Sequence, residues 1–181
     1  VEQITAPTKD QPRKEPLHIP MRLGFVVSGG KDKPAKLASG ERLKDNVIHI
    51  HKQSESFEFK SVTARNVPSL MRDFSAPVNL RMEYTEKELI FLAQNDQNLF
   101  NRWQAAQSLM TNHLLYSIER VKNKKAPGGN ARLARLIGKT VLNEDIDPAY
   151  RAAFLSLPTE ADLVRALGNN IDPTANGKAK K

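Results

Sequence analysis

The sequence of 181 residues contains no cysteine, few aromatic residues and no long apolar run. Without cysteine, the chain can form no disulfide, no thiolate metal site and no cysteine nucleophile. Its apolar runs extend over only a few residues, which predicts no membrane span, and its first residues lack the pattern of a secretory signal. The His-Glu-x-x-His spacing of a zinc motif and the Gly-x-Ser-x-Gly spacing of a nucleophile elbow are absent as well. Several classes of enzyme site are therefore excluded from these residues.

Apolar residues make up 39% of the chain, enough to bury a core in one domain or in two small ones. The net charge is +8, but it is spread evenly, because residues 1–83 and residues 84–181 each carry 14 Lys and Arg against 10 Asp and Glu. A nucleic-acid binder usually concentrates its charge on one face. The basic cluster Arg120, Lys122, Lys124 and Lys125 lies at a predicted helix end, where it complements the helix dipole.

Residues 1–83 have the alternating pattern of half-buried strands separated by turns. The pattern predicts five or six strands, within residues 1–5, 17–27, 46–52, 56–62 and 75–84, and a hairpin turn at "SGGKDKP". An immunoglobulin-like sandwich has about seven strands. We therefore expect an all-β immunoglobulin-like sandwich over residues 1–83 that is incomplete at its N-terminal end, with an open edge strand that can pair with a second copy of the chain.

Residues 84–181 have helical periodicity, with clear signals for helix starts. The capping box Thr85 to Glu88 opens the first predicted helix, and the second begins near Asp96 or Asn98 and runs to about Lys124. A third covers residues 131–142, a fourth begins at Asp147-Pro148, and a fifth runs from Thr159 to Leu167 before Gly168. Such helix pairs indicate an all-α, solenoid-like segment. Asp172-Pro173 repeats the start signal close to the last residue, so this segment looks truncated.

The candidate chemical groups each have a simpler explanation. "SGGKDK" lacks the spacing of a phosphate loop, the carboxylates Glu144, Asp145 and Asp147 precede a helix and suit capping, and Trp103 with Phe100 suits core packing. His49 and His51 are two apart on a predicted strand, so both point the same way and could share a metal ion with a third ligand from elsewhere. No partner is evident near them in the sequence, and we expect exposed strand histidines; His113 is expected on a helix face.

Several long segments resemble the bacterial aminopeptidase N (alanyl aminopeptidase) family, a family of gluzincin zinc metallopeptidases. They are "EPLHIP", "VPSLMRDFSAPV", "FNRWQAAQSL" and "NEDIDPAYRAAFLSLPTEADL", and the similarity runs collinearly from about Thr5 to Asp172. The resemblance implies that the chain is most of the family's β-sandwich, over 1–83, followed by the start of its helical C-terminal domain, over 84–181.

Family members remove N-terminal residues from peptides, and the resemblance implies zinc in the full-length enzyme, with the helical domain enclosing the active site. Neither the zinc motif nor the amine-binding Gly-Ala-Met-Glu-Asn motif occurs here. We therefore assign no catalytic, cofactor-binding or metal-binding residue, and expect the chain alone to be an inactive scaffold. Its expected partners are the remainder of the same polypeptide and that enzyme's peptide substrates, in the bacterial cytoplasm, without nucleic acid or membrane span. The alternative is a freestanding basic module that binds nucleic acid or protein.

The stretch Val67–Val78, "VPSLMRDFSAPV", lies where the strand-like pattern gives way to the helical one. We expect Leu70 and Phe74 to fill the core of the sandwich. Arg72 and Asp73 should point to opposite faces because they are adjacent on an extended chain. We expect each of them to bond to helical residues rather than to the other.

Overall fold

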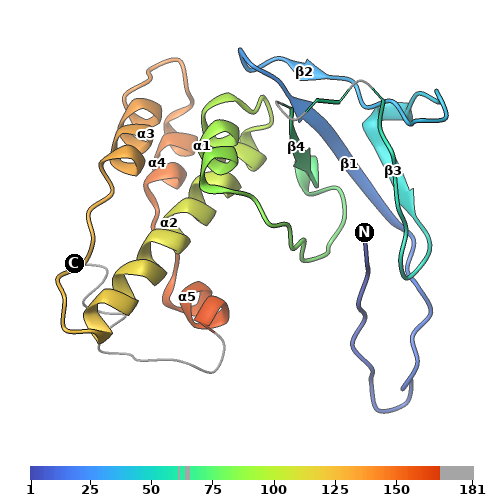
Figure 1. Ribbon diagram of the computed structural model, residues 1–181, viewed down its shortest axis with the longest axis horizontal. Coiled ribbons are helices and arrows are strands. Elements are labelled where there is room, and N and C mark those ends of the chain that lie inside the picture. Colours follow the sequence, from blue (N-terminus) through green and yellow to red (C-terminus); the bar gives the residue numbers. More distant parts are fainter. Residues whose placement is uncertain (61, 64–65, 168–181) are drawn as a thin grey trace. The chain divides into compact units, whose positions relative to one another are not determined.

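The computed structural model describes residues 1–60, 62–63 and 66–167, which fall into two units (Figure 1). The first unit contains residues 1–83 and also the short segment Asn95–Asn101. The second contains residues 84–94 and the chain from Arg102 onward. The segment between the first two helices therefore belongs to the strand unit and not to the helical one.

The first unit is built on one long strand, β1 (Ile19–Val26), which pairs antiparallel with all three other strands of the unit's described residues. These partners are β2 (Asp32–Lys33), β3 (Val47–Ile50) and β4 (Val67–Leu70). Met21, Leu23 and Phe25 alternate along β1 and are buried together with Ile48 and Ile50 of β3. The alternation in the sequence predicted this core correctly, as it did the hairpin turn between β1 and β2.

Three of the predicted strands are not strands in the structure, so the described residues contain four strands instead of five or six. Where the structure describes them, residues 1–5 and 56–62 make only the isolated bridges Glu2 to Ser54 and Leu37 to Phe59, and residues 75–84 make none. The apolar residues of the last two segments still cover the core, half-buried: Phe57, Phe59, Val78 and Leu80. Alternation therefore identified residues that face the core, but not residues that pair in a ladder.

The segment Val67–Phe74 differs from its prediction in two ways. Val67–Leu70 is a paired strand although it contains Pro68, and the chain then turns through a single helical turn at Arg72–Phe74. Met71, Asp73 and Phe74 all have left-handed backbone angles, with φ near +55°. This turn ends the alternation, so Met71 and Arg72 are buried, while Phe74 is 57% exposed and lies edge-to-face with Phe100. The prediction that Phe74 fills the core was wrong, whereas Leu70 does pack against it.

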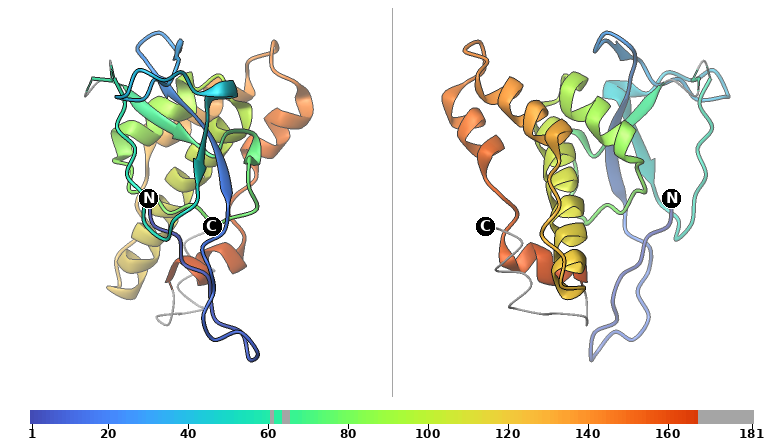
Figure 2. Two further views of the ribbon diagram at one scale, coloured as in Figure 1. Left: turned by 90° about the vertical axis from the view of Figure 1, so that its right-hand side faces the viewer. Right: turned by 60° about the vertical axis from the view of Figure 1, so that its left-hand side comes forward.

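The second unit consists of five helices within the described residues, in the order predicted. They are α1 (Glu86–Asn95), α2 (Leu99–Lys122), α3 (Ala131–Val141), α4 (Pro148–Leu155) and α5 (Glu160–Leu167). α3 and α4 pack against each other, and α2 passes this pair to reach α5 near its C-terminal end (Figure 2). The predicted start signal at Asp172-Pro173 and the stop at Gly168 lie outside the described residues.

The predicted capping residues occupy the predicted positions. Thr85 and Glu88 form a reciprocal capping box, with the Thr85 N–H donating to Glu88 over 2.7 Å and the Glu88 N–H donating to Thr85 over 3.3 Å. Asp147 accepts from the backbone of residues 149 and 150, and Thr159 pairs with Asp162 in the same way as the first box. Asn98 caps α2 by accepting from the Asn101 N–H. These signals are local, which is why the sequence alone locates them.

The helical core takes one large side chain from each of the last two helices. Phe154 of α4 is fully buried, whereas Ala149, Ala153 and Leu157 around it are exposed. Leu163 of α5 is fully buried against Leu114 and Ile118 of α2. No helix of the described residues is long and apolar enough to cross a membrane.

Candidate functional site

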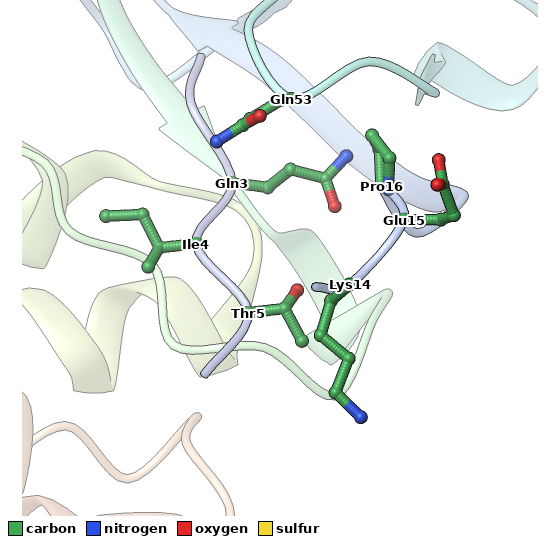
Figure 3. Close-up of a pocket in the computed structure, with 7 residues that line it drawn as sticks. All are labelled: Gln3, Ile4, Thr5, Lys14, Glu15, Pro16 and Gln53. Carbon is green, nitrogen blue, oxygen red and sulfur yellow. The ribbon is translucent and has the colours of Figure 1, made fainter. Parts of the chain in front are cut away.

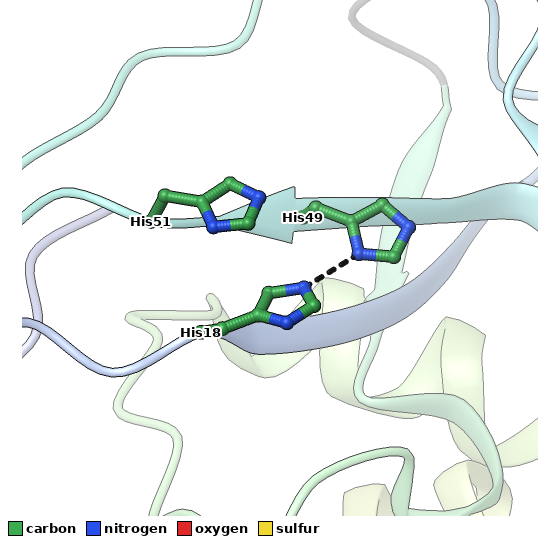
Figure 4. Close-up of side chains that lie close together, drawn as sticks. All are labelled: His18, His49 and His51. Carbon is green, nitrogen blue, oxygen red and sulfur yellow. Dashed lines mark hydrogen bonds between the residues drawn. The ribbon is translucent and has the colours of Figure 1, made fainter.

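Three histidines gather on the exposed side of the β1–β3 pair (Figure 4). Ile19 lies opposite Ile50 in the register, so His18 continues the pairing opposite His51, while His49 lies opposite Pro20. Each ring offers a nitrogen, and the three nitrogens lie within 4.8 Å of one another. His18 Nε2 and His49 Nδ1 are 2.8 Å apart in a hydrogen bond, and the rings of His18 and His51 stack with centroids 4.4 Å apart. All three side chains are exposed.

His18 is the residue that sequence reasoning missed. No partner is evident near His49 and His51 in the sequence, because His18 is 31 residues away from His49. The antiparallel register of the two alternating strands brings it there. The sequence signal was the alternation in both strands, which shows which residues face the core and which face away from it. If the two strands pair antiparallel, the residues that face away at the start of the first strand and at the end of the second come together.

A buried ionic network surrounds Arg72 inside the first unit. The guanidinium donates to Asp32 at the start of β2 over 2.9 Å and to Asp96 over 3.1 Å. Its Nε donates to the Ser69 hydroxyl over 2.9 Å, and that hydroxyl also accepts from the Asn101 amide. Asp96 and Ser69 are essentially inaccessible to solvent. The network joins β4, the β1–β2 hairpin and the segment Asn95–Asn101 into one polar cluster.

The network contains two carboxylates for one guanidinium, and its pKa values reflect this. Burial alone would lower the pKa of Arg72, but the hydrogen bond to Asp32 and the charges of Asp96 and Asp32 raise it above its usual range. Burial raises the pKa of Asp96, although hydrogen bonds from Ser69 and from the Asn98 N–H, and the charge of Arg72, oppose the rise. The charged form of Arg72 is thus stabilised, whereas burial disfavours the charged form of Asp96.

Two neighbouring features complete this cluster. Asp73 accepts from Arg22 over 2.7 Å and from the Asn98 amide over 2.6 Å. Arg72 and Asp73 thus have separate partners as predicted, but these partners lie in the strands and in the segment between α1 and α2, not in the helices as expected. The chain at Arg72–Phe74 is also a helical turn and not the extended backbone that the prediction assumed. Gly24 of β1 lies under the guanidinium, where a Cβ atom would be 2.5 Å from Arg72 Nη1. This polar cluster holds the fold together and presents no nucleophile to solvent.

A small pocket of about 90 Å³ lies near the N-terminal segment, lined by Gln3, Ile4, Thr5, Lys14, Glu15, Pro16 and Gln53 (Figure 3). Its most buried polar side chain, Gln3, donates to the carbonyls of Leu17 and Lys52 and accepts from the Leu17 N–H. Lys14 donates to Thr8 and Gln11. Gln3 therefore holds two backbone segments in place, and Lys14 bonds to side chains of its own segment.

The other candidate groups have structural roles. Asp147 caps α4, and the indole N–H of Trp103 donates to the Ala153 carbonyl over 3.2 Å. "SGGKDK" forms the β1–β2 turn, in which Gly29 and Gly30 have positive φ angles. Arg120 lies in the last turn of α2, where it donates to the Ala126 carbonyl and covers the Tyr116 ring. None of these groups forms a catalytic pair with another in the described contacts.

Two family models together match nearly the whole chain. The model described as "Domain of unknown function (DUF3458) Ig-like fold" matches residues 1–83, and "Domain of unknown function (DUF3458_C) ARM repeats" matches residues 86–181. Both descriptions agree with the expected fold classes, a strand unit followed by a helical one.

Three proteins similar to this chain come from bacteria. The chain is 32% identical to "Aminopeptidase N" of Escherichia coli over 181 residues, and 31% identical to that of Haemophilus influenzae over 180 residues. These matches cover 100% and 99% of the chain. The chain is 33% identical to "Aminopeptidase N" of Caulobacter vibrioides over 139 residues, which cover 76% of the chain and 16% of that protein. The chain spans only about a fifth of the length of the first two relatives, 20% in each case.

A solved structure agrees in fold. It is the crystal structure of Legionella pneumophila aminopeptidase A in complex with aspartic acid, which matches 90% of this chain and 18% of its own, with a TM-score of 0.67 and 24% identity. The chain belongs to the family that these two domain models define, and it is homologous to the C-terminal domains of bacterial aminopeptidase N.

Proposed function

We propose that this chain is a non-catalytic C-terminal segment of a zinc-dependent aminopeptidase that removes N-terminal amino acids from peptides. The observation that carries the proposal is the similarity to aminopeptidase N, which extends over the full 181 residues but covers only 20% of the relative's length. The proposed partners follow from it: the catalytic remainder of the same polypeptide, and the peptide substrates of the whole enzyme. A bacterial cytoplasmic location is part of this proposal and rests on the same resemblance.

The residues present do not fit the catalytic zinc of that family. The chain has no His-Glu-x-x-His motif, and among the described residues the single cluster able to bind a metal is the exposed group His18, His49 and His51. The carboxylate beside this group, that of Glu55, already accepts from the backbone N–H groups of His51 and Lys52 and is not one of the clustered ligands. We therefore assign the peptidase chemistry to residues outside this chain and derive no catalytic step from it.

The proposed role of the chain is that of a scaffold, with one domain over residues 1–83 and the start of a helical domain over 84–181. The polar cluster around Arg72 supports the scaffold role of the first domain, because it anchors the segment Asn95–Asn101 to the strands through Asp96 and Asn101. For the helices, we propose that they help to enclose the active site of the whole enzyme. That part rests on the family resemblance.

An activity assay tests the proposal directly. The purified 181-residue chain is incubated with an aminoacyl-arylamide, with and without added zinc, and no turnover is expected in either case. The complete polypeptide, expressed with the coding sequence upstream of Val1, is expected to contain a His-Glu-x-x-His motif and to cleave the same substrate. Zinc-dependent turnover by the short chain would refute the proposal, as would an upstream sequence without the motif.

A nucleic-acid assay separates the proposal from its alternative. A freestanding basic module would bind a DNA or RNA duplex at low salt, and its affinity would fall steeply as salt rises. The scaffold proposal expects no such binding by the 181-residue chain.

A further inference from the structure

The three histidines share one outward face because of how their strands are built. On β3, Ile48 and Ile50 point into the core, so His49 and His51 must point away from it. His18 immediately precedes β1 and lies over the same face, with its ring between those of the other two, as the close-up shows (Figure 4). The gathering of the three rings therefore follows from a fixed strand register.

The backbone on both sides of this histidine group is anchored. The buried side chain of Gln3 bonds to the backbone of Leu17 and of Lys52, which are the neighbours of His18 and His51. The Glu55 carboxylate accepts from the His51 N–H over 2.7 Å and from the Lys52 N–H over 3.1 Å. Two of the three histidines thus project from backbone positions that are set by separate hydrogen bonds, and His49 lies inside a paired strand.

The spacing of the nitrogens suits a shared metal ion. A bound Zn²⁺ lies about 2.0–2.1 Å from each imidazole nitrogen, so two neighbouring ligand nitrogens are separated by about 3.0–3.4 Å. The nitrogens of His18 and His49 are already 2.8 Å apart, and all three lie within 4.8 Å. Since the rings are exposed, modest rotations of their side chains bring the third nitrogen to the required distance without moving the strands.

We propose that His18, His49 and His51 bind one divalent transition-metal ion of the zinc and copper class. Neutral imidazole suits these ions better than it suits Mg²⁺ or Ca²⁺, which prefer oxygen ligands. Three protein ligands leave a fourth position for water or for a ligand from outside the chain. The chain has no cysteine that would compete for the ion, and the fourth histidine, His113, lies on α2 in the other unit.

The site is separate from the family's peptidase zinc and does not depend on the function proposed above. Its effect is structural: the ion ties the beginning of β1 to the end of β3, two positions that are far apart in the sequence. A ligand that binds the folded chain and not the unfolded one raises the free energy of unfolding with the logarithm of its free concentration, once that concentration exceeds the dissociation constant. The first unit should therefore become more resistant to unfolding when zinc is added.

Calorimetry on the 181-residue chain tests the site. The chain must be free of a histidine tag, and it is titrated with ZnCl₂ and, separately, with CuCl₂ in a buffer that does not chelate them. One saturable site per chain is expected. His18→Ala, His49→Ala and His51→Ala should each weaken it by at least about tenfold, because even the loss of a residue that only supports a ligand commonly costs that much. His113→Ala is the matched control and should bind as the parent chain does.

A second measurement locates the ion. Cu²⁺ is paramagnetic, so it should broaden most strongly the amide signals of the residues next to His18, His49 and His51. Far-UV circular dichroism checks that each variant has kept its fold. The proposal is overturned if no saturable binding occurs, if His113→Ala weakens binding as much as His18→Ala does, or if the broadening appears elsewhere.

Discussion

Replacing Arg72 with methionine should destabilise the first unit by about 3–5 kcal/mol, the usual cost of removing one partner from a buried ion pair. The replacement keeps most of the length of the side chain but removes the cation that is paired with Asp96, which is 1% exposed. Asp32 matters less, because its side chain is 32% exposed and can be hydrated again. The cost is therefore mainly that of leaving Asp96 charged and buried.

An independent argument gives the same magnitude. A buried carboxylate that loses its cation can take up a proton instead, and this sets a ceiling on the penalty. Starting from the ordinary pKa of 3.8, protonation at pH 7 costs about 4 kcal/mol at 1.36 kcal/mol per pH unit. Because the folded pKa of Asp96 is raised, its protonated form favours folding, and this contribution is lost as pH rises through the folded pKa. The difference between Arg72→Met and the parent chain should thus shrink as pH falls toward 3.8.

The assay must report on the first unit. The single tryptophan, Trp103, belongs to the second unit, so its fluorescence does not follow the strands. The amide signals of β1 in NMR spectra, recorded through a urea series at several pH values, do follow them. Arg22→Met is the matched control, since Arg22 pairs with Asp73 at the surface, where such a pair contributes below about 1 kcal/mol.

A double-mutant cycle with Asp96→Asn isolates the energetic cost of leaving the Asp96 carboxylate unpaired. Asp96→Asn leaves Arg72 paired with Asp32, and the double variant carries no unpaired carboxylate at position 96. At neutral pH we expect the double variant to be more stable than Arg72→Met alone, with a coupling of about 0.5–3 kcal/mol. A loss within about 0.5 kcal/mol for Arg72→Met, or a double variant no more stable than that single one, would show the reasoning to be wrong.

Further predictions concern the other elements. Phe154→Ala should cost about 3–5 kcal/mol because its ring is fully buried, and urea unfolding followed by Trp103 fluorescence checks this. Phe74→Ala should cost no more than about 1.5 kcal/mol for the loss of its edge contact with Phe100, and urea unfolding followed by the β1 amide signals checks this. Asp147→Ala should lose about 0.5–2 kcal/mol of cap stability in the same fluorescence assay, and Asp145→Ala nearly none. Hydrogen bonds from Arg22 and Asn98 lower the pKa of Asp73 in the folded chain. The stability that Asp73 contributes is therefore present above pH 3.8 and is lost as pH falls through the folded pKa. In urea melts below pH 3.8, Asp73→Asn should lose less stability with falling pH than the parent chain does.

The helices could be predicted because their signals are local. The Thr85 and Thr159 capping boxes and the Asp147 cap each lie within three residues of the groups they bond, and all three helices begin beside them. The strands were less predictable because pairing depends on distant residues. Phe57 and Phe59 face the core without a ladder, and Val67–Leu70 pairs with β1 in spite of its proline.

The two polar groupings of the first unit depend on distant pairing in the same way. His18 meets His49 through strand register, and Arg72 meets Asp32 across 40 residues. The prediction for Phe74 was wrong for a different reason. Three residues between 71 and 74 have left-handed backbone angles, which reverse the side-chain pattern. Neither Met71 nor Phe74 is a residue type that commonly adopts such angles. Local composition does not reveal any of these arrangements.

Gly24 shows how a residue without a functional group can be as sensitive to mutation as a catalytic residue. A methyl group there would collide with a guanidinium that is held by Asp32, Asp96 and Ser69 and cannot easily move aside. In a saturation-mutagenesis experiment, position 24 should therefore tolerate almost nothing, as an active-site residue would, although it carries no functional group. Intolerance at this glycine would report the space reserved for a neighbour's side chain, and a survey that ranks positions by mutational sensitivity should not mistake it for catalysis.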